Sequence, residues 1–190
     1  MVVYCEGLVY VIGNNVKYRA PSKCYIYNPS ENTWTSAPDL DEWNLFNAVS
    51  LGGCIYLTPQ SIFAPGHEID NRDYLSFCLE TKTQTWKKIS DVPPSLISFI
   101  MDNQLCCANY VTSTHKVEAS LHVYRYDEAK DKWDFEILPA MYTGSCYDTC
   151  TQGENGHLMF YNSCYLGSDG MGRPVKFLSF NPVSKSWYHY

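Results

Sequence analysis

The chain has 190 residues, of which 45% are apolar and 18% are charged, and its formal net charge at pH 7 is −6. This composition supplies enough apolar side chains for a core, which excludes a disordered chain, and the acidic balance argues against a surface that follows nucleic-acid phosphates. The sequence has no apolar run of about 18 residues, the length of a membrane span. Its 16 tyrosines and 5 tryptophans favour β-sheet over helix.

Alternation of apolar and polar residues predicts short strands in four successive groups. The first group is expected at residues 8–12, 23–27 and 34–37, and the second at 48–51, 54–57, 74–79 and 86–90. The third is expected at 96–101, 105–108, 120–126 and 133–138, and the fourth at 146–151, 157–161, 176–180 and 187–190. Short turns that contain Gly or Asn are expected at 6–7, 52–53 and 102–103. The groups divide the chain into repeats of about 1–40, 41–92, 93–140 and 141–190.

A tryptophan opens the last strand of each group, at Trp34, Trp86, Trp133 and Trp187, with spacings of 52, 47 and 54 residues. A large apolar residue stands seven places before each tryptophan: Tyr27, Leu79, Tyr126 and Phe180. Repeats of this length and strand number match the blades of a β-propeller, which bury their faces only by stacking on their neighbours. We therefore expect the repeated aromatic residues to pack between blades.

These repeats resemble the kelch family. The resemblance rests on the apolar strand at 8–12, which is followed by Gly13-Asn14, and on the Tyr-x6-Trp spacing from Tyr27 to Trp34. It covers essentially the whole chain. The sequence departs from the family pattern where the glycine doublet after the second strand is reduced. The resemblance implies an all-β, kelch-type β-propeller that occupies residues 1–190 as one domain. Both ends look cut within a blade, so we expect the four visible blades, each of four antiparallel strands, to belong to a larger ring of about six.

The connections between the second and third strands are longer than a hairpin needs, at residues 14–22, 58–73, 109–119 and 162–175. Repeat symmetry places all four at the same end of the propeller. Tyrosine and arginine are the residue types that most often dominate binding energy at protein interfaces. We therefore predict a partner-binding face that includes Tyr18, Arg19, Phe63, Arg72, Tyr110, His115, Tyr165 and Arg173. The alternative is that these residues belong to ordinary solvated loops.

Trp43 stands outside the repeat pattern, in an acidic link between the first and second groups. Two roles are open for it: a cap on the core, which is the commoner position of a tryptophan, or an exposed anchor for a partner. We include Trp43 in the predicted partner-binding face.

Nine cysteines are scattered along the chain, an odd number without a Cys-x-x-Cys pair. This pattern disfavours both a disulfide scaffold and a structural zinc site. Only Cys146, Cys150 and Cys164 with His157 could be drawn as a metal site. Thiols in apolar runs are expected to be small buried hydrophobic residues, at Cys5, Cys24, Cys54, Cys78 and Cys106. These thiols and the lack of a secretory leader at the first residues favour a reducing compartment, the cytoplasm or the nucleus.

The sequence shows no convergent set of catalytic residues, so we expect neither enzyme activity nor a metal or cofactor. The 5 histidines show no ligand spacing. Copper oxidases and glycosidases are the enzyme alternatives for a propeller of this kind.

The resemblance is closest to the C-terminal propellers of BTB–kelch proteins. It implies a protein-interaction module that binds a protein or peptide substrate, and neither nucleic acid nor a membrane. In that family, BTB and BACK domains engage a cullin-RING ubiquitin ligase. Neither domain is found in these 190 residues, so the ligase is implied as a partner only for a longer parent protein. The alternatives are a scaffold or actin-associated kelch protein and a stand-alone truncated kelch protein.

Overall fold

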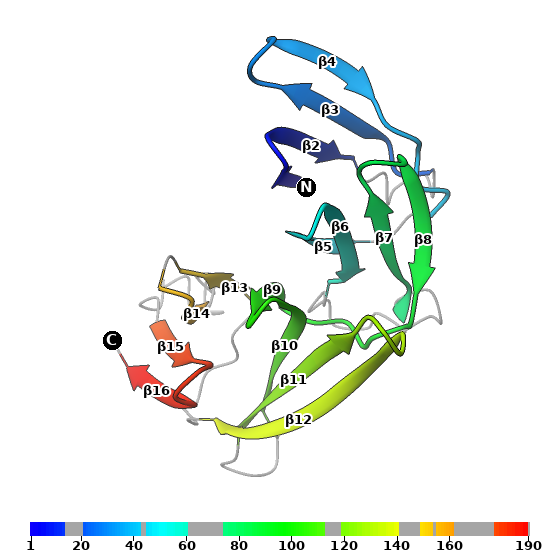
Figure 1. Cartoon of the computed structure of the whole chain (residues 1–190). Helices are drawn as coiled ribbons and strands as arrows, with labels where there is room; N and C mark the ends of the chain where they lie inside the picture. Colours follow the sequence, from blue (N-terminus) through cyan, green and yellow to red (C-terminus); the bar gives the residue numbers. More distant parts are fainter. Residues whose placement is uncertain are drawn as a thin grey trace, which may run out of the picture.

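The computed structural model describes residues 1–13, 21–42, 45–60, 74–112, 119–140, 149–153, 155–161 and 177–189. Within these ranges the chain forms four antiparallel sheets of four strands each, and neighbouring strands in a sheet are consecutive in sequence. Figure 1 shows the sheets following one another along an arc, with the last strand of each sheet toward the outside. This arrangement confirms the predicted fold class, an all-β propeller with four four-stranded blades.

The strands follow the repeats. Blade 1 contains β1 (Val2–Cys5), β2 (Leu8–Ile12), β3 (Cys24–Asn28) and β4 (Thr33–Ser36), and blade 2 contains β5 (Phe46–Leu51), β6 (Cys54–Pro59), β7 (Ser76–Glu80) and β8 (Thr85–Ile89). Blade 3 contains β9 (Ile97–Met101), β10 (Gln104–Thr112), β11 (Ala119–Asp127) and β12 (Lys132–Ala140). Blade 4 contains β13 (Thr149–Gln152), β14 (Leu158–Tyr161), β15 (Phe177–Asn181) and β16 (Ser186–His189). Each predicted strand overlaps one of these strands, and β1 precedes the first of them. In the described part of the chain, no helix has the length and apolar character needed to cross a membrane.

The turns within the blades place residues at positive φ. The hairpins at Glu6-Gly7, Gly52-Gly53 and Asp102-Asn103 have positive φ at both residues, as type I′ turns require, and agree with the sequence prediction. The turn before each last strand has one residue at a φ of 49° to 53°, two positions before the tryptophan: Asn32, Gln84, Asp131 and Lys185. This second set was not predicted from the sequence.

Buried side chains gather in the seams, the interfaces where neighbouring blades stack. The seam between blades 1 and 2 contains Tyr10, Ile12, Ile26, Ile55, Leu57 and Leu79. The seam between blades 2 and 3 contains Tyr56, Cys78, Ile89, Leu105 and Tyr126. The seam between blades 3 and 4 contains Phe99, Tyr110, Leu121, Leu158, Phe160 and Phe180. Each blade therefore depends on its neighbour for the burial of its apolar faces.

Three of the repeat tryptophans form a hydrogen bond to the preceding blade. The Nε1–H of Trp86 donates to the carbonyl of Pro38 at 2.8 Å, that of Trp133 to Ser90 at 2.8 Å, and that of Trp187 to Pro139 at 2.9 Å. Each acceptor lies near the end of the last strand of the preceding blade. The prediction that these residues pack between blades is confirmed for all three. Trp34 has the equivalent position in blade 1, where it is 60% exposed.

A second set of hydrogen bonds joins blades 2 and 3 at Asp131, in the turn between β11 and β12. Its carboxylate Oδ1 accepts hydrogen bonds from the Tyr126 hydroxyl at 2.7 Å and from the Ser90 N–H at 2.8 Å. These hydrogen bonds lower the pKa of the Asp131 carboxyl. Ser90 also donates its hydroxyl to the Asp131 carbonyl, so the end of blade 2 is bound to blade 3 through several contacts.

We expect Trp86→Ala to lower the free energy of unfolding by about 3 kcal/mol, because it removes an aromatic side chain from a seam and the donor from the Pro38 carbonyl. Trp34→Ala is the matched control at the equivalent exposed position and is expected to cost less than about 1 kcal/mol. Denaturant unfolding of both variants and of the wild-type chain measures these values. Equal losses at the two positions would contradict the structural role of Trp86.

We expect Asp131→Asn to change how stability depends on pH. Because the folded chain lowers the pKa of Asp131, its carboxylate stabilises the fold fully above the ordinary value of 3.8, and this contribution is lost as the pH falls through the lowered pKa. Unfolding free energies measured from about pH 6 down to about pH 2 should therefore converge for the wild-type chain and the variant at the acid end. Asp134→Asn, on β12 of the same blade, is the control and should follow the wild-type curve. A wild-type advantage that is constant with pH would refute this role for the carboxylate.

Candidate functional site

Most residues of the predicted partner-binding face lie outside the described residues. They are Tyr18, Arg19, Trp43, Phe63, Arg72, His115, Tyr165 and Arg173. Their grouping at one end of the propeller stays a prediction.

Tyr110 is described, and the structure corrects its predicted place in an exposed loop. It lies in β10, where it pairs with Leu121 of β11, and it is 3% exposed. Its ring centroid lies 5.8 Å from that of Phe160 and 6.1 Å from that of Trp187. The loop prediction was wrong because β10 continues beyond Ala108 to Thr112, so Tyr110 shares the buried face of the strand. Tyr110 belongs to the core between blades 3 and 4.

The described cysteines are mostly core residues. Cys5, Cys24, Cys78 and Cys106 are buried as expected, whereas Cys54 is only half-buried. Burial raises the pKa of Cys24 to about 11 and that of Cys106 to about 12, so both remain protonated thiols at neutral pH.

The metal cluster drawn from the sequence cannot be assembled within the described ranges. Cys146 and Cys164 lie outside them. His157 is described, and its Nδ1 lies 3.2 Å from the Ser179 hydroxyl. Among the described residues, no group of three or more His, Cys, Asp or Glu side chains could hold a metal ion.

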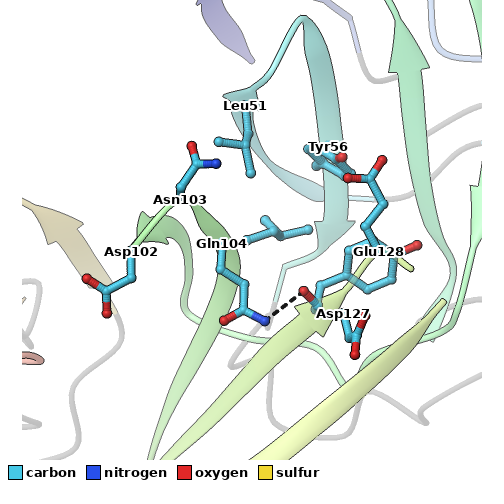
Figure 2. Close-up of a pocket in the computed structure, with 9 residues that line it drawn as sticks. Leu51, Tyr56, Asp102, Asn103, Gln104, Asp127 and Glu128 are labelled. Carbon is cyan, nitrogen blue, oxygen red and sulfur yellow. Dashed lines mark hydrogen bonds between the residues drawn. The ribbon is translucent and has the colours of Figure 1, made fainter. Parts of the chain in front are cut away.

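A cavity of about 310 Å³ opens between blades 2 and 3, and Figure 2 shows the residues around it. We call it the seam pocket. Blade 2 contributes Leu51 and Tyr56, and blade 3 contributes Asp102, Asn103, Gln104, Leu105, Tyr126, Asp127 and Glu128. The turn between β5 and β6 and the turn between β9 and β10 meet here, so the pocket lies at the end of the blades where the first strand turns into the second. The sequence analysis placed no functional residue at this end.

The floor of the seam pocket is aromatic and aliphatic. Tyr56, Leu105 and Tyr126 are at most 4% exposed, and the two tyrosine rings lie 6.2 Å apart in an edge-to-face arrangement. Gln104 donates its Nε2–H to the Tyr126 carbonyl at 3.0 Å, the bond drawn in Figure 2. Because the Tyr126 hydroxyl also donates to Asp131, this wall of the pocket is held in place from two sides.

The Tyr56 hydroxyl has no hydrogen-bond partner among the residues that the structure describes. Burial raises the pKa of Tyr56, so the phenol is neutral and can donate or accept one hydrogen bond. The residue as a whole is 3% exposed, and its hydroxyl oxygen is not among the fully buried polar atoms, so it reaches solvent at the pocket. The Tyr56 hydroxyl is therefore available to a group that enters the pocket.

The rim of the seam pocket is acidic. Asp102 and Asn103 form the turn on one side, and Asp127 and Glu128 lie on the other side, as Figure 2 shows. Lys130 forms an ion pair with Asp127. Within the described residues, the carboxylates of Asp102 and Glu128 form neither an ion pair nor a hydrogen bond. The lining offers carboxylate, amide and phenol groups, which can form polar contacts with a ligand.

No family model matches the chain, and no curated protein matches it by sequence. Solved structures do match its fold. It is similar to an oligogalacturonate lyase in complex with manganese, with a TM-score of 0.56 and 9% identity over 100% of this chain and 52% of that one. A polysaccharide lyase of the ulvan lyase kind gives a TM-score of 0.58 and 12% identity over 98% of this chain and 52% of that one.

The β-propeller domain of the Trilobed protease from Pyrococcus furiosus, described as having an open velcro topology, gives a TM-score of 0.56 and 6% identity. The match covers 100% of this chain and 55% of that domain. The chain thus spans about half the length of these three structures. Identities this low show the β-propeller fold alone, and the kelch resemblance rests on the sequence motif.

Proposed function

We propose that this propeller is a protein-binding module without catalytic activity. The observation that carries the proposal is the seam pocket, because the Tyr56 hydroxyl and the exposed carboxylates of Asp102 and Glu128 line it without a partner among the described residues. The two carboxylates are exposed and carry negative charge, so a basic group of a partner can form charge-assisted hydrogen bonds with them. The pocket lies at an end of the propeller, where loops and turns carry recognition on a rigid scaffold.

The size of the pocket favours a single side chain as its occupant. Its volume of about 310 Å³ is at the lower end of the range of small-molecule sites, roughly 300 to 1,000 Å³. An oligosaccharide, such as the lyases among the structural neighbours act on, needs a longer groove. A side chain that projects from a protein surface fits a cavity of this size at the seam between two blades.

Two finer parts belong to this proposal, the first from the kelch resemblance and the second from the cysteine pattern. The first is that the module selects a substrate for a cullin-RING ubiquitin ligase through BTB and BACK domains of a parent protein. The second is that it works in the cytoplasm or nucleus, where its many free thiols stay reduced. A scaffold or actin-associated role is the alternative within the same class.

Affinity capture from a reducing lysate, measured by quantitative mass spectrometry, tests the proposal. The expected result is a protein partner that the wild-type chain and Glu31→Gln enrich equally, since Glu31 is an exposed acid in a turn of blade 1. Two variants are compared with the wild-type chain: the double variant Asp102→Asn with Glu128→Gln, and a triple variant with alanine at positions 19, 72 and 173. One of the two is expected to lose the partner. The first loss would assign recognition to the seam pocket and the second to the predicted loop face. Recovery of chaperones alone, equally with every variant, would contradict a binding function.

A further inference from the structure

We infer that the seam pocket binds the side chain of an arginine that projects from the partner. This inference rests on the proposed function and names the chemistry of its ligand. Four features of the pocket carry it: the unpaired carboxylates, the apolar floor, the Tyr56 hydroxyl, and the contrast with the equivalent position in the neighbouring seam.

The rim selects for positive charge. Asp127 already has Lys130 as its partner, which leaves the Asp102 and Glu128 carboxylates to attract a cation from outside the described chain. The chain as a whole carries a net charge of −6, so the long-range field also favours a basic partner. A charge-assisted hydrogen bond to a carboxylate is roughly twice as strong as a neutral one.

The floor suits the rest of a long basic side chain. The half-buried Leu51 presents aliphatic surface, against which the methylene stem of an arginine can pack while its charged head reaches the rim. The rings of Tyr56 and Tyr126 line the same cavity and pack edge to face against each other, which fixes the shape of its floor. A small metal cation would gain nothing from this apolar surface.

The Tyr56 hydroxyl supplies a third polar contact. Tyr56 is 3% exposed, and its hydroxyl can accept a hydrogen bond from a guanidinium N–H. Figure 2 shows the Glu128 carboxylate beside Tyr56, so one bound group can reach both. The carboxylates lie on two sides of the pocket, and a guanidinium offers five donors along two edges, whereas an ammonium is a compact point charge. The arrangement therefore favours arginine over lysine.

The seam between blades 1 and 2 shows how a tyrosine at this position is otherwise satisfied. Tyr10 of β2 is equivalent to Tyr56 of β6, and Gln84 of blade 2 donates its Nε2–H to the Tyr10 hydroxyl at 3.4 Å. Asp131 is the residue of blade 3 equivalent to Gln84, but its carboxylate accepts from Tyr126 and Ser90 instead. The Tyr10 hydroxyl thus has a hydrogen-bond partner in the first seam, whereas the Tyr56 hydroxyl has none among the described residues in the second seam, where the pocket lies.

The test uses methyl NMR of the whole chain, with labelled leucines reporting on Leu51 and Leu105. The probe is the peptide acetyl-glycyl-arginyl-glycinamide, and its citrulline analogue is the neutral control with nearly the same shape. We expect saturable shifts at these two leucines, with a dissociation constant on the order of 1 mM for a single side chain. Citrulline should bind at least about tenfold more weakly, and added salt should weaken the arginine peptide.

Variants assign the contacts. Asp102→Asn and Glu128→Gln should each weaken binding about tenfold, which is about 1.4 kcal/mol, while Glu31→Gln should leave it unchanged. Tyr56→Phe should weaken binding severalfold without lowering the melting temperature, because it deletes a hydroxyl that has no partner in the free chain. A loss of folding stability with Tyr56→Phe would show that the hydroxyl is bonded within the chain and would overturn its role as a ligand contact.

Three outcomes would overturn the inference: no saturable shift at the two leucines, equal binding of the citrulline peptide, or equal binding of the corresponding lysine peptide. The proposed function fails separately. If a captured partner is lost with Asp102→Asn and Glu128→Gln while the arginine peptide does not bind, the module binds proteins and only its ligand chemistry is wrong. If the arginine peptide binds but no partner is captured, the site is correct and the protein-binding function is wrong.

Discussion

The stacking of each blade on the one before it is the constraint on which the rest of the structure depends. A single four-stranded sheet with two apolar faces cannot bury them alone, and in this chain the burial comes with a hydrogen bond from an indole N–H to a backbone carbonyl of the preceding blade. Blade 1 shows what the same face is like uncovered: Val2, Tyr4, Tyr25 and Trp34 are 69%, 63%, 47% and 60% exposed. In blades 2 to 4 the tryptophan position therefore marks the seam with the preceding blade.

Much of this architecture could be predicted from the sequence, because its causes are local and repeat. Period-two alternation located the strands, and the tryptophan spacing located the blades. Tyr110 shows where local reasoning failed: the polar Asn109 looked like the end of a strand, yet β10 pairs with β11 as far as Thr112. Strand length at that point depends on pairing with a neighbour, which composition does not reveal.

The residue two positions before each tryptophan shows another limit. Asn32 and Asp131 are residue types that adopt positive φ readily, but Gln84 and Lys185 adopt the same conformation, with φ of 53° in both. The turn geometry, set by the spacing of the strands, overrides residue preference there. Sequence reasoning could have found the position from the two favourable residues, but the two others give no local signal for it.

The seam pocket could not be predicted, because its walls come from turns that are far apart in sequence and meet only when blades 2 and 3 stack. What the sequence does contain is the difference between the seams: glutamine at position 84 and aspartate at position 131. An amide can donate to a tyrosine of the preceding blade, whereas an ionised carboxylate can only accept. The Asp131 carboxylate accepts hydrogen bonds from Ser90 and Tyr126. The difference between glutamine and aspartate at this equivalent position therefore leaves the Tyr56 hydroxyl without the hydrogen bond that Tyr10 receives. In a repeat protein whose scaffold positions are constrained by stacking, such departures from the repeat are where a binding site can form while the stacking is kept.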